Sequence, residues 1–318
     1  IAPITGTVYV DRNRNSTLDG APTDSRIAGV TVTLVLGSTC SGPVVATTTT
    51  DASGNYTFSG VSVGLPYTLC ETQPAGYAEG GVNPGASGSS SATNAITLTN
   101  LPATGSAGNH FAERVGSLAG GVYLDANNDG ALQGAEAAIA GVTVTLTGTD
   151  AAGNTVNRST TTDATGAWRF DDLLAAGPGG YSVTEQAAQP VVGGVATLDG
   201  RSAAGTTGGT AAAVGDSPSR VSAIALAAGA DGTGYLFGEI LPVSLGGQVF
   251  IDINDNGVQN APGDTGIAGV TLVVTGTDDT GAAVSRTVTT AADGSYALSD
   301  LRPGTYTVTE PTQPAGTT

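Results

Sequence analysis

The chain has 318 residues, of which 39% are hydrophobic and only 12% are charged. The apolar residues are mostly small or β-branched, which favours strands, and they are numerous enough for packed cores, which argues against wholesale disorder. The net charge of −17 comes from 27 acidic and 10 basic residues, so nucleic acid is excluded as a partner and divalent cations are attracted.

Two features bear on location. No segment approaches 18 consecutive apolar residues, so we expect no membrane insertion in this part of the protein. Because the sequence begins at Ile1 without a methionine or a signal peptide, we interpret it as a piece of a longer mature protein.

One order of motifs recurs three times along the chain. The copies open with GTVYVDRNRNSTLDG at Gly6, GGVYLDANNDGALQG at Gly120 and GGQVFIDINDNGVQN at Gly246. Each copy continues with an IAGVT phrase, a threonine-rich run, an aromatic strand-like run and a YT or YS run. Apolar and polar residues alternate with period two in these runs, and turn signals separate them, which indicates short strands. We therefore predict an all-β chain of tandem β-sandwich domains.

The repeats predict three domains, at residues 1–115, 116–241 and 242–318. The third domain is expected to be partial, because the closing strand-like runs of the first two copies have no counterpart in it. The joints, at residues 113–117 and 239–243, are short and predict restricted bending between domains.

Gly/Ser/Ala-rich stretches occur at corresponding places of the first two copies, at residues 80–94 and 200–215. A flexible linker is one reading of such composition. Because a strand-like run follows each stretch, we favour long loops within a domain.

The ordered phrases VYxDxNxDG, GVTVTL, TTDxxGxYxFxxL and YxVxExQPxGY resemble the B repeats of staphylococcal Sdr surface proteins and the related Cna B-type modules. The resemblance extends over essentially the whole chain. It implies prealbumin-like, Ig-like Greek-key β-sandwiches in an extracellular protein of a bacterial cell surface. In that family such modules serve as calcium-stiffened stalks or spacers that display an adhesive tip.

The opening motif of each copy has the residue pattern of a calcium-binding loop, in which every second residue around a tight turn has an oxygen-bearing side chain. The second copy fits best. In the first, Ser16 replaces the expected glycine and Pro22 the closing glutamate, for which Asp24 can substitute. In the third, Gly263 stands at the closing position with Asp264 beside it. The predicted Ca²⁺ ligands are Asp125, Asn127, Asp129, the carbonyl of Ala131, Gln133 and Glu136 in the second copy, Asp11, Asn13, Asn15, Asp19 and Asp24 in the first, and Asp252, Asn254, Asn256, Asn260 and Asp264 in the third.

The alternative interpretation of these motifs is a set of ordinary Asn/Asp-rich turns. Their recurrence at one position of the repeat favours calcium, and the charge count predicts the tightest binding in the second copy. Bound ions at these loops would stiffen the array.

Cys40 and Cys70 are the only cysteines. Two cysteines in one domain of a secreted protein most often pair, so we predict a disulfide, with two buried thiols as the alternative.

Cna B-type modules often carry a Lys–Asn isopeptide bond promoted by an acid in the strand before QPAGY. Glu71, Glu185 and Glu310 occupy that position, but the chain has no lysine, so the crosslink cannot form. We expect these glutamates to be strand-surface or hydrogen-bonding residues.

The residues do not predict an enzyme. His110 is the only histidine, and the acid pair Asp171–Asp172 is expected in a solvated turn. The LPATG sequence at 101–105 copies a sortase signal, but two further copies of the repeat follow it, so we interpret it as a strand-ending loop.

The leading functional hypothesis is a non-enzymatic stalk of a bacterial surface adhesin or filament. Alternatives are a module that binds a host or neighbouring-cell protein or glycan, and a subunit that self-assembles when the open edge of the third domain takes a strand from another copy. An accessory domain of a secreted hydrolase is a fourth possibility.

Overall fold

The structure is a computed structural model that describes residues 1–88, 90–260 and 263–314. The last four residues of the third predicted domain, 315–318, lie outside the described residues. All regular elements within these ranges are β-strands, which confirms the predicted all-β class. No helix among the described residues has the length and apolarity needed to cross a membrane.

The first unit is a sandwich of two sheets. One sheet has the order β2-β1-β10-β7, with β5 also paired to β1, and the other has the order β4-β3-β6-β9-β8. β1 and β10 run parallel, with Val8 opposite Phe111, and the other pairings are antiparallel. The strands are β1 (Ala2–Asp11), β2 (Asp24–Arg26), β3 (Thr31–Leu36), β4 (Val44–Thr49), β5 (Asn55–Val61), β6 (Tyr67–Glu71), β7 (Ala78–Asn83), β8 (Ser90–Ala92), β9 (Ala95–Leu98) and β10 (Ser106–Arg114).

The second unit repeats this plan. Its sheets have the orders β14-β11-β21-β18 and β13-β12-β15-β20-β19, and β16 and β17 form a separate hairpin. β11 and β21 are the parallel pair, with Val122 opposite Phe237. The strands are β11 (Gly116–Leu124), β12 (Thr143–Asp150), β13 (Thr155–Thr161), β14 (Ala167–Leu173), β15 (Ala176–Glu185), β16 (Val191–Val192), β17 (Val195–Ala196), β18 (Leu198–Ala203), β19 (Thr210–Ala211), β20 (Arg220–Ile224) and β21 (Asp231–Ile240).

The third unit contains the first strands of the same plan. β22 pairs with β27, β23 with β24, and β25 lies between β26 and β28. Among the described residues, none forms a counterpart of β10 or β21 beside β22. The strands are β22 (Val243–Gln248), β23 (Phe250–Ile251), β24 (Thr265–Gly266), β25 (Thr271–Asp278), β26 (Ala283–Thr289), β27 (Ser295–Leu301) and β28 (Gly304–Thr309).

Each unit has its own hydrophobic core between its sheets. The first core includes Val8, Leu69 and Phe111, and the second includes Trp168 and Phe237. The core of the third unit is small, as expected for a sandwich without a closing strand, and its cluster of buried residues consists of Val274, Leu298 and Leu301.

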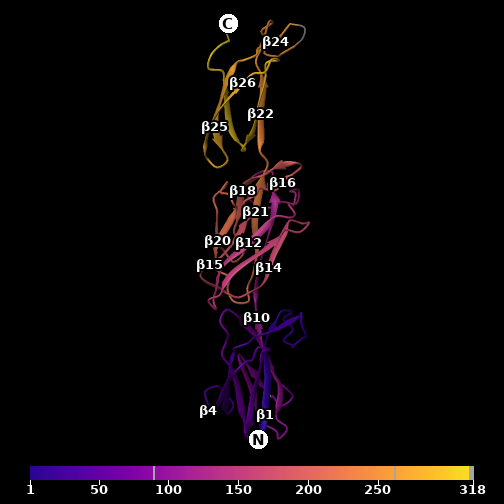
Figure 1. Cartoon of the computed structure of the whole chain (residues 1–318), viewed down its shortest axis with the longest axis vertical. Helices are drawn as coiled ribbons and strands as arrows, with labels where there is room; N and C mark the ends of the chain where they lie inside the picture. The colour runs from indigo at the N-terminus through magenta and orange to yellow at the C-terminus, as the bar shows by residue number, and fades with distance from the viewer. Residues whose placement is uncertain (89, 261–262, 315–318) are drawn as a thin grey trace.

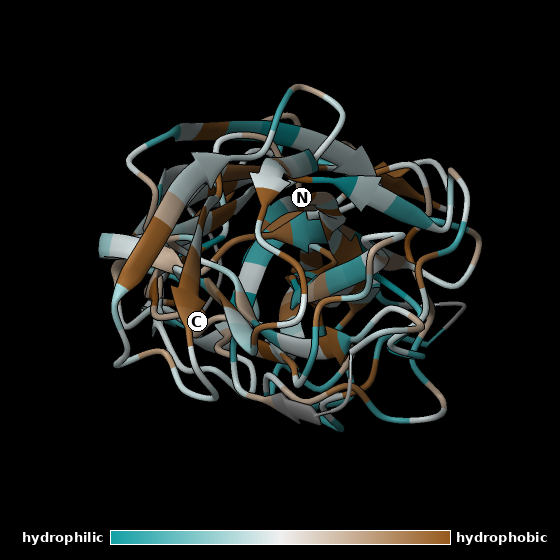
Figure 2. Cartoon of the chain, turned by 90° about the horizontal axis from the view of Figure 1, so that it is seen from below, coloured by the Kyte–Doolittle hydropathy of each residue, from teal (hydrophilic) through white to brown (hydrophobic). Residues whose placement is uncertain are grey.

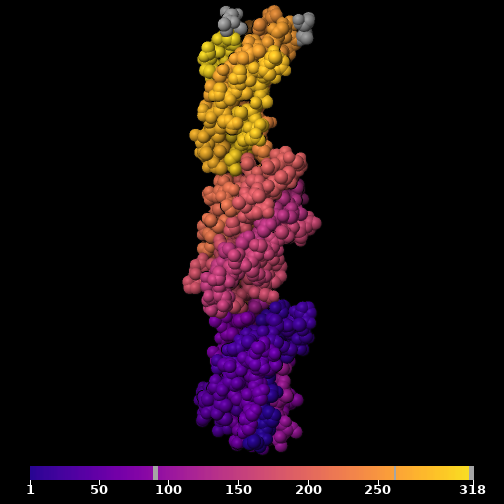
Figure 3. Space-filling view, viewed as in Figure 1, coloured from indigo at the N-terminus to yellow at the C-terminus, as the bar shows by residue number. Residues whose placement is uncertain are grey.

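The three units are arranged end to end along the long axis, with the N-terminus at one end (Figure 1). They project behind one another in the end-on view of Figure 2 and form a continuous rod in the space-filling view of Figure 3. Only Val115 separates β10 from β11, and only Leu241 and Pro242 separate β21 from β22. Since the chain passes from one sandwich into the next almost within a strand, the backbone leaves little freedom at either joint.

The two Gly/Ser/Ala-rich stretches lie inside the sandwiches, where they contribute β7 and β8 in the first unit and β18 and β19 in the second. LPATG forms a turn between β9 and β10, in which the Gly105 amide donates to the Pro102 carbonyl at 3.0 Å and Leu101 is buried. Both stretches and LPATG therefore belong to the fold of a unit.

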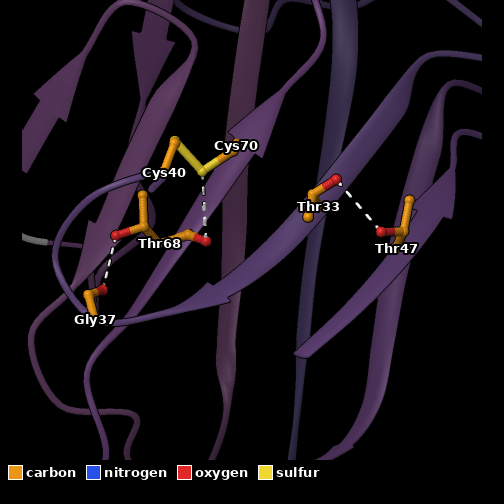
Figure 4. The surroundings of a disulfide bond; sticks show 6 residues. All are labelled: Thr33, Gly37, Cys40, Thr47, Thr68 and Cys70. Carbon is orange, nitrogen blue, oxygen red and sulfur yellow. Dashed lines mark hydrogen bonds between the residues drawn. A yellow bond between two sulfur atoms is a disulfide. The ribbon is translucent and has the colours of Figure 1, made fainter. Parts of the chain in front are cut away.

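The predicted disulfide is confirmed. Cys40, in the connection from β3 to β4, is bonded to Cys70 on β6, with a Cα–Cα distance of 5.8 Å (Figure 4). Beside it the Thr68 hydroxyl donates to the Gly37 carbonyl at 2.8 Å. The disulfide and this hydrogen bond both link the β3–β4 connection to β6.

Candidate metal centres

The three predicted calcium loops lie at equivalent places, at the end of β1 in the first unit, after β11 in the second and after β23 in the third. The first ligand position holds Asp11, Asp125 and Asp252, and the first two of these are 1% exposed. In every loop one carboxylate oxygen of this aspartate accepts the amide of the fifth residue, at 3.1 to 3.2 Å, and the other accepts the amide of the sixth, at 2.7 to 2.8 Å. The same local fold has therefore formed from three different sequences.

The sixth position shows why glycine is expected there. Gly130 and Gly257 have φ angles of 80° and 75°, in the left-handed region. Ser16 adopts φ 57° at the same place, so the first loop keeps the turn without its glycine.

The closing acid stands at a different position in each loop but makes the same contact. Asp24, Glu136 and Asp264 each accept the amide of the ninth loop residue, at 2.7, 2.9 and 3.0 Å. Glu136 and Asp264 also accept the amide of the second loop residue, at 3.1 and 3.0 Å. The substitutions expected from the sequence, Asp24 and Asp264, thus lie where the loop needs a carboxylate.

The other predicted ligands gather around these acids. In the second loop Asn127 and Gln133 both donate to the Asp129 carboxylate, at 2.9 and 2.6 Å. The Ala131 amide donates to the same side chain at 2.8 Å. In the first loop Asn13 and Asn15 both donate to Asp19, at 2.8 and 2.9 Å, and in the third Asn254 donates to Asn260 at 3.3 Å.

Hydrogen bonds lower the pKa of two of the loop acids. The Ala131 amide and the Gln133 side chain hold the pKa of Asp129 below its ordinary value, and the Gly257 amide does so for Asp252. Asp24 is buried, and its Oδ1 accepts no hydrogen bond. Carboxylate and amide side chains gathered at one turn are the residue types that calcium prefers, so the residues present fit the ion.

The fourth residue of each loop is not a ligand candidate. It has a left-handed backbone conformation, and in the first two loops its side chain reaches the next unit. Arg14, Asn128 and Asp255 all have φ near 55°, at 58°, 55° and 54°. Arg14 forms an ion pair with Asp231 of the second unit at 2.8 Å, and Asn128 donates to Asp279 of the third unit at 2.8 Å. Each of the first two loops therefore contacts the next unit directly.

Further contacts close each joint. Arg12 pairs with Asp172 across the first joint at 2.6 Å, and the Ala175 amide donates to the Gly76 carbonyl at 2.8 Å. Across the second joint Arg302 donates to the Asp199 carbonyl at 2.7 Å. The expectation that Asp171 and Asp172 form a turn is wrong, because both lie in β14, but both side chains are solvent-exposed as expected and pair with arginines.

A second group of acids lies inside the second unit. Glu185, Asp199 and Glu239, from β15, β18 and β21, are 3%, 4% and 0% exposed, and one oxygen of each lies within 4.8 Å of the others. Burial and the neighbouring Glu239 raise the pKa of Glu185, and burial also raises the pKa of Glu239. The expectation that Glu185 lies on the strand surface is wrong, because it is buried, but its carboxyl group is hydrogen-bonded to that of Glu239.

The first unit has acids at the same strand positions. Glu71, Glu79 and Glu113 lie on β6, β7 and β10, and Glu113 is opposite Glu79 as Glu239 is opposite Asp199. Burial, followed by the charge of Glu113, raises the pKa of Glu71, and burial raises the pKa of Glu113 against the opposing hydrogen bond from Gln73. The surface expectation for Glu71 is also wrong, since it is 8% exposed.

Sequence reasoning missed both these acid groups and the joint contacts. The signal for the acids was present in the glutamate near the end of each closing strand, in NHFAE and GYLFGE. The joint contacts have no sequence signal of their own, because they depend on how two units meet.

Comparison with known proteins gives the family of this fold. The family model described as SdrD B-like domain matches residues 2–111, 116–224 and 243–318. The chain is similar to the serine-aspartate repeat-containing protein D of Staphylococcus aureus strain Newman, with 32% identity over 95% of this chain and 21% of that protein. It is also similar to the serine-aspartate repeat-containing protein F of Staphylococcus epidermidis, with 30% identity over 95% of this chain and 16% of that protein.

Two solved structures illustrate the structural neighbourhood. The Bacillus anthracis TIE protein aligns with 98% of this chain and 45% of its own, at 14% identity and a TM-score of 0.36. The shaft pilin SpaA from Lactobacillus rhamnosus GG aligns with 75% of this chain and 97% of its own, at 17% identity and a TM-score of 0.29.

The chain spans about a fifth of the length of the curated relatives it matches. The family model, in contrast, covers well over half of the chain in three consecutive matches, and the two relatives confirm the resemblance read from the motifs. The chain therefore belongs to the family of SdrD B-like domains, as a structural module and not an enzyme.

Proposed function

We propose that the chain is a calcium-stiffened stalk of a secreted bacterial surface protein, built from modules at residues 1–115, 116–241 and 242–318. Family membership and the end-to-end arrangement of the sandwiches support this role. The stalk would hold another part of the protein away from the cell. Direct binding of a host or neighbouring-cell protein or glycan stays a prediction, since no observation favours it.

Calcium would bind at the three loops, through the ligands predicted from the sequence. Asp125, Asp129 and Glu136 supply the charge in the second loop, with Asn127, Gln133 and the Ala131 carbonyl as neutral oxygen donors. The bound ion supplies a fixed positive charge that holds these oxygens in one arrangement, and the chain supplies the geometry around it.

One observation carries the proposal. At each joint, a residue whose side chain contacts the next unit is part of a loop that would hold the ion. Arg14 lies between the predicted ligands Asn13 and Asn15, and Asn128 lies between Asn127 and Asp129. Ordering a loop therefore orders the side chain that contacts the next unit. In this way an ion that touches only one module would restrict bending between two.

The energy involved is modest. Extracellular sites of this kind have a Kd of roughly 10⁻⁴ to 10⁻³ M. With calcium about tenfold above Kd, each site would add on the order of 1.4 kcal/mol to the free energy of unfolding. That amount does not fold a module by itself, but it is enough to order a loop beside a joint.

A calorimetric calcium titration of the 318-residue chain, with thermal unfolding in calcium and in chelator, tests this proposal. We expect binding at the loops and a rise in the melting temperature of each unit. Identical unfolding in calcium and in chelator would contradict it.

The third unit has an open sheet edge, which bears on the alternative of assembly by strand addition. Gly6 and Gly120 have no room for a side chain, because an added Cβ would lie 1.7 Å from a carbonyl of the parallel closing strand. Gly247 stands at the same position, where β22 has no described partner on that side. Ile251, the counterpart of the buried Val10, is 45% exposed. We infer that a strand with the pattern of β21 fits this edge, whichever chain it belongs to.

A peptide with the sequence of residues 232–240, GTGYLFGEI, tests the strand-addition proposal. It should bind the chain one to one and raise the melting temperature of the third unit only. The control peptide carries aspartate in place of the residue corresponding to Phe237, which packs into the second core. Equal binding of both peptides, or of neither, would contradict a specific strand acceptor.

A further inference from the structure

We propose that the first joint is a salt-sensitive hinge and that the second joint is not. High ionic strength loosens the contact between the first and second units, while the second and third units keep their relative orientation. The inference concerns the contacts between the units themselves and does not rest on calcium binding at the loops.

Ion pairs that are open to water cross the first joint. Arg12 pairs with Asp172 at 2.6 Å, and the two side chains are 34% and 46% exposed. Arg14 pairs with Asp231 at 2.8 Å, and these side chains are 47% and 41% exposed. All four residues line one groove between the units. Because dissolved ions screen exposed charges, this set of contacts weakens as salt is added.

Uncharged groups hold the same joint at a second place. The Ala175 amide donates to the Gly76 carbonyl at 2.8 Å. Gly76 packs against Leu174, where an added Cβ would lie 2.9 Å from the leucine Cβ, and Gly229 packs in the same way against Ala78, at 2.8 Å. None of these five residues lines the charged groove. Screening does not act on uncharged contacts, so they remain as the pivot when the ion pairs weaken.

The second joint is built from different contacts. Among the described residues, no ion pair crosses it. The Asn128 side chain donates to Asp279 at 2.8 Å. In the other direction, Arg302 donates to the backbone carbonyl of Asp199 at 2.7 Å. Each of these bonds has one uncharged partner, so the attraction between two full charges does not hold this joint.

The charge of Arg302 is paired inside its own unit. Its guanidinium lies 2.6 Å from Asp279, and the two side chains are only 19% and 9% exposed. The second unit packs over them, since a Cβ added at Gly215 would lie 2.6 Å from Thr280 and 3.4 Å from the guanidinium carbon. Partly buried pairs are screened much less than exposed ones. Because both charges belong to the third unit, weakening this pair would not separate the units.

Two positions of the loop account for the difference between the joints. The first loop has Arg12 and Arg14 at its second and fourth positions, where the second loop has Ala126 and Asn128. The third loop has Asp255 at the fourth position, and the φ angles there are 58°, 55° and 54° in chain order. The same backbone conformation therefore accepts arginine, asparagine or aspartate, so the charge at this position can be changed without changing the loop.

Small-angle scattering of the 318-residue chain at saturating calcium, in low and high NaCl, tests the proposal. The screening length falls from about 10 Å at about 0.1 M salt to about 3 Å at about 1 M. The wild type should then show a wider spread of shapes, with a population of bent chains about fivefold larger at high salt.

Three variants locate the effect. Arg12→Ala/Arg14→Asn, which gives the first loop the joint residues of the second, should produce the same curve at both salt concentrations. Arg14→Asp should respond in the opposite sense, because two carboxylates would then face each other at the joint and repel until salt screens them. The matched control, Arg286→Asn, changes an exposed residue on β26 away from the joints and should respond like the wild type.

Two results would overturn the proposal. A wild-type curve that is the same at both salt concentrations would show that screening does not loosen the first joint. A double variant that responds as strongly as the wild type would show that salt acts elsewhere in the chain. Circular dichroism at both concentrations verifies that the units stay folded. Calcium stiffening is tested separately, by comparing calcium with chelator at low salt, so either proposal can fail without the other.

Discussion

Arg14, which lies inside the first predicted calcium loop, forms an ion pair with Asp231 in the closing strand of the second unit, with 2.8 Å between Nη2 and Oδ2. This pair joins a predicted ion site to the neighbouring module. Asp231 also accepts the Ser117 hydroxyl at 2.7 Å, so the arginine meets a carboxylate that is already held in place.

Replacing Arg14 with alanine should loosen the first joint without unfolding either unit. The arginine and aspartate side chains are 47% and 41% exposed, and exposed pairs contribute about 0 to 1 kcal/mol to stability. We therefore expect melting temperatures close to those of the wild type, but a broader distribution of shapes in small-angle scattering with calcium present.

Arg286→Ala is the matched control for this variant, because Arg286 is exposed on β26 away from the joints. It should leave the scattering curve unchanged. A similar broadening in both variants would show that the Arg14–Asp231 pair has no special part in the joint.

Glu136→Gln should weaken calcium binding at the second loop by on the order of tenfold, because calcium affinity depends on the number of charged ligands. The glutamine keeps the size of the side chain, so loss of affinity reports the lost charge. Titration calorimetry measures the change. Asp163→Asn, in a surface turn of the same unit, is the control and should bind calcium like the wild type.

Reduction of the Cys40–Cys70 bond should destabilise the first unit only. The bond closes a loop with a sequence separation of 30 residues. On the chain-entropy model this corresponds to roughly 3 to 4 kcal/mol. Scanning calorimetry of the double variant Cys40→Ser/Cys70→Ser should show the transition of the first unit at lower temperature. The second unit has no cysteine, so its transition is the internal reference. An unchanged first transition would show that the bond adds nothing to stability.

The first unit should lose stability as the pH rises. Burial raises the pKa of Glu71 from 4.5 to about 9 and that of Glu113 from 4.5 to about 8. The folded state then binds more protons than the unfolded state. The contribution of these two groups to the free energy of unfolding is therefore complete below about pH 4.5 and is lost as the pH rises towards 8 and 9. The slope is up to about 1.4 kcal/mol per pH unit for each group.

Denaturant unfolding between pH 5 and 9 measures this slope. Glu113→Gln, which has no proton to lose, should flatten it, whereas Asp51→Asn, in an exposed turn of the same unit, should not. A first unit whose stability is flat or rises over this range would show that the pair is not protonated in the fold.

The sequence was sufficient for the features that depend on local pattern. Period-two alternation and turn residues predict the strands, and the loop motif predicts which oxygens come together, including the displaced closing acids Asp24 and Asp264. Two cysteines in one repeat predict the disulfide.

The remaining features arise from tertiary contact. Glu185 looks like any polar residue at the end of a strand, and only the packing of β18 and β21 against β15 shows that it is buried beside two further acids. Arg14 and Asn128 are not ligands, so the loop motif says nothing about them. Their role depends on the orientation of the next unit, which no short-range pattern encodes.

Small-angle scattering of the 318-residue chain in calcium and in chelator tests the central claim, that ions at the loops stiffen the joints. The account predicts that in calcium the protein is a rod with a single maximum dimension. In chelator it predicts an ensemble with a shorter average maximum dimension and a wider spread of shapes. The triple variant Asp11→Asn, Asp129→Asn and Asp252→Asn should resemble the chelated protein even in calcium. A wild-type curve that is the same in both conditions, with folding of the units verified by circular dichroism, would contradict the claim.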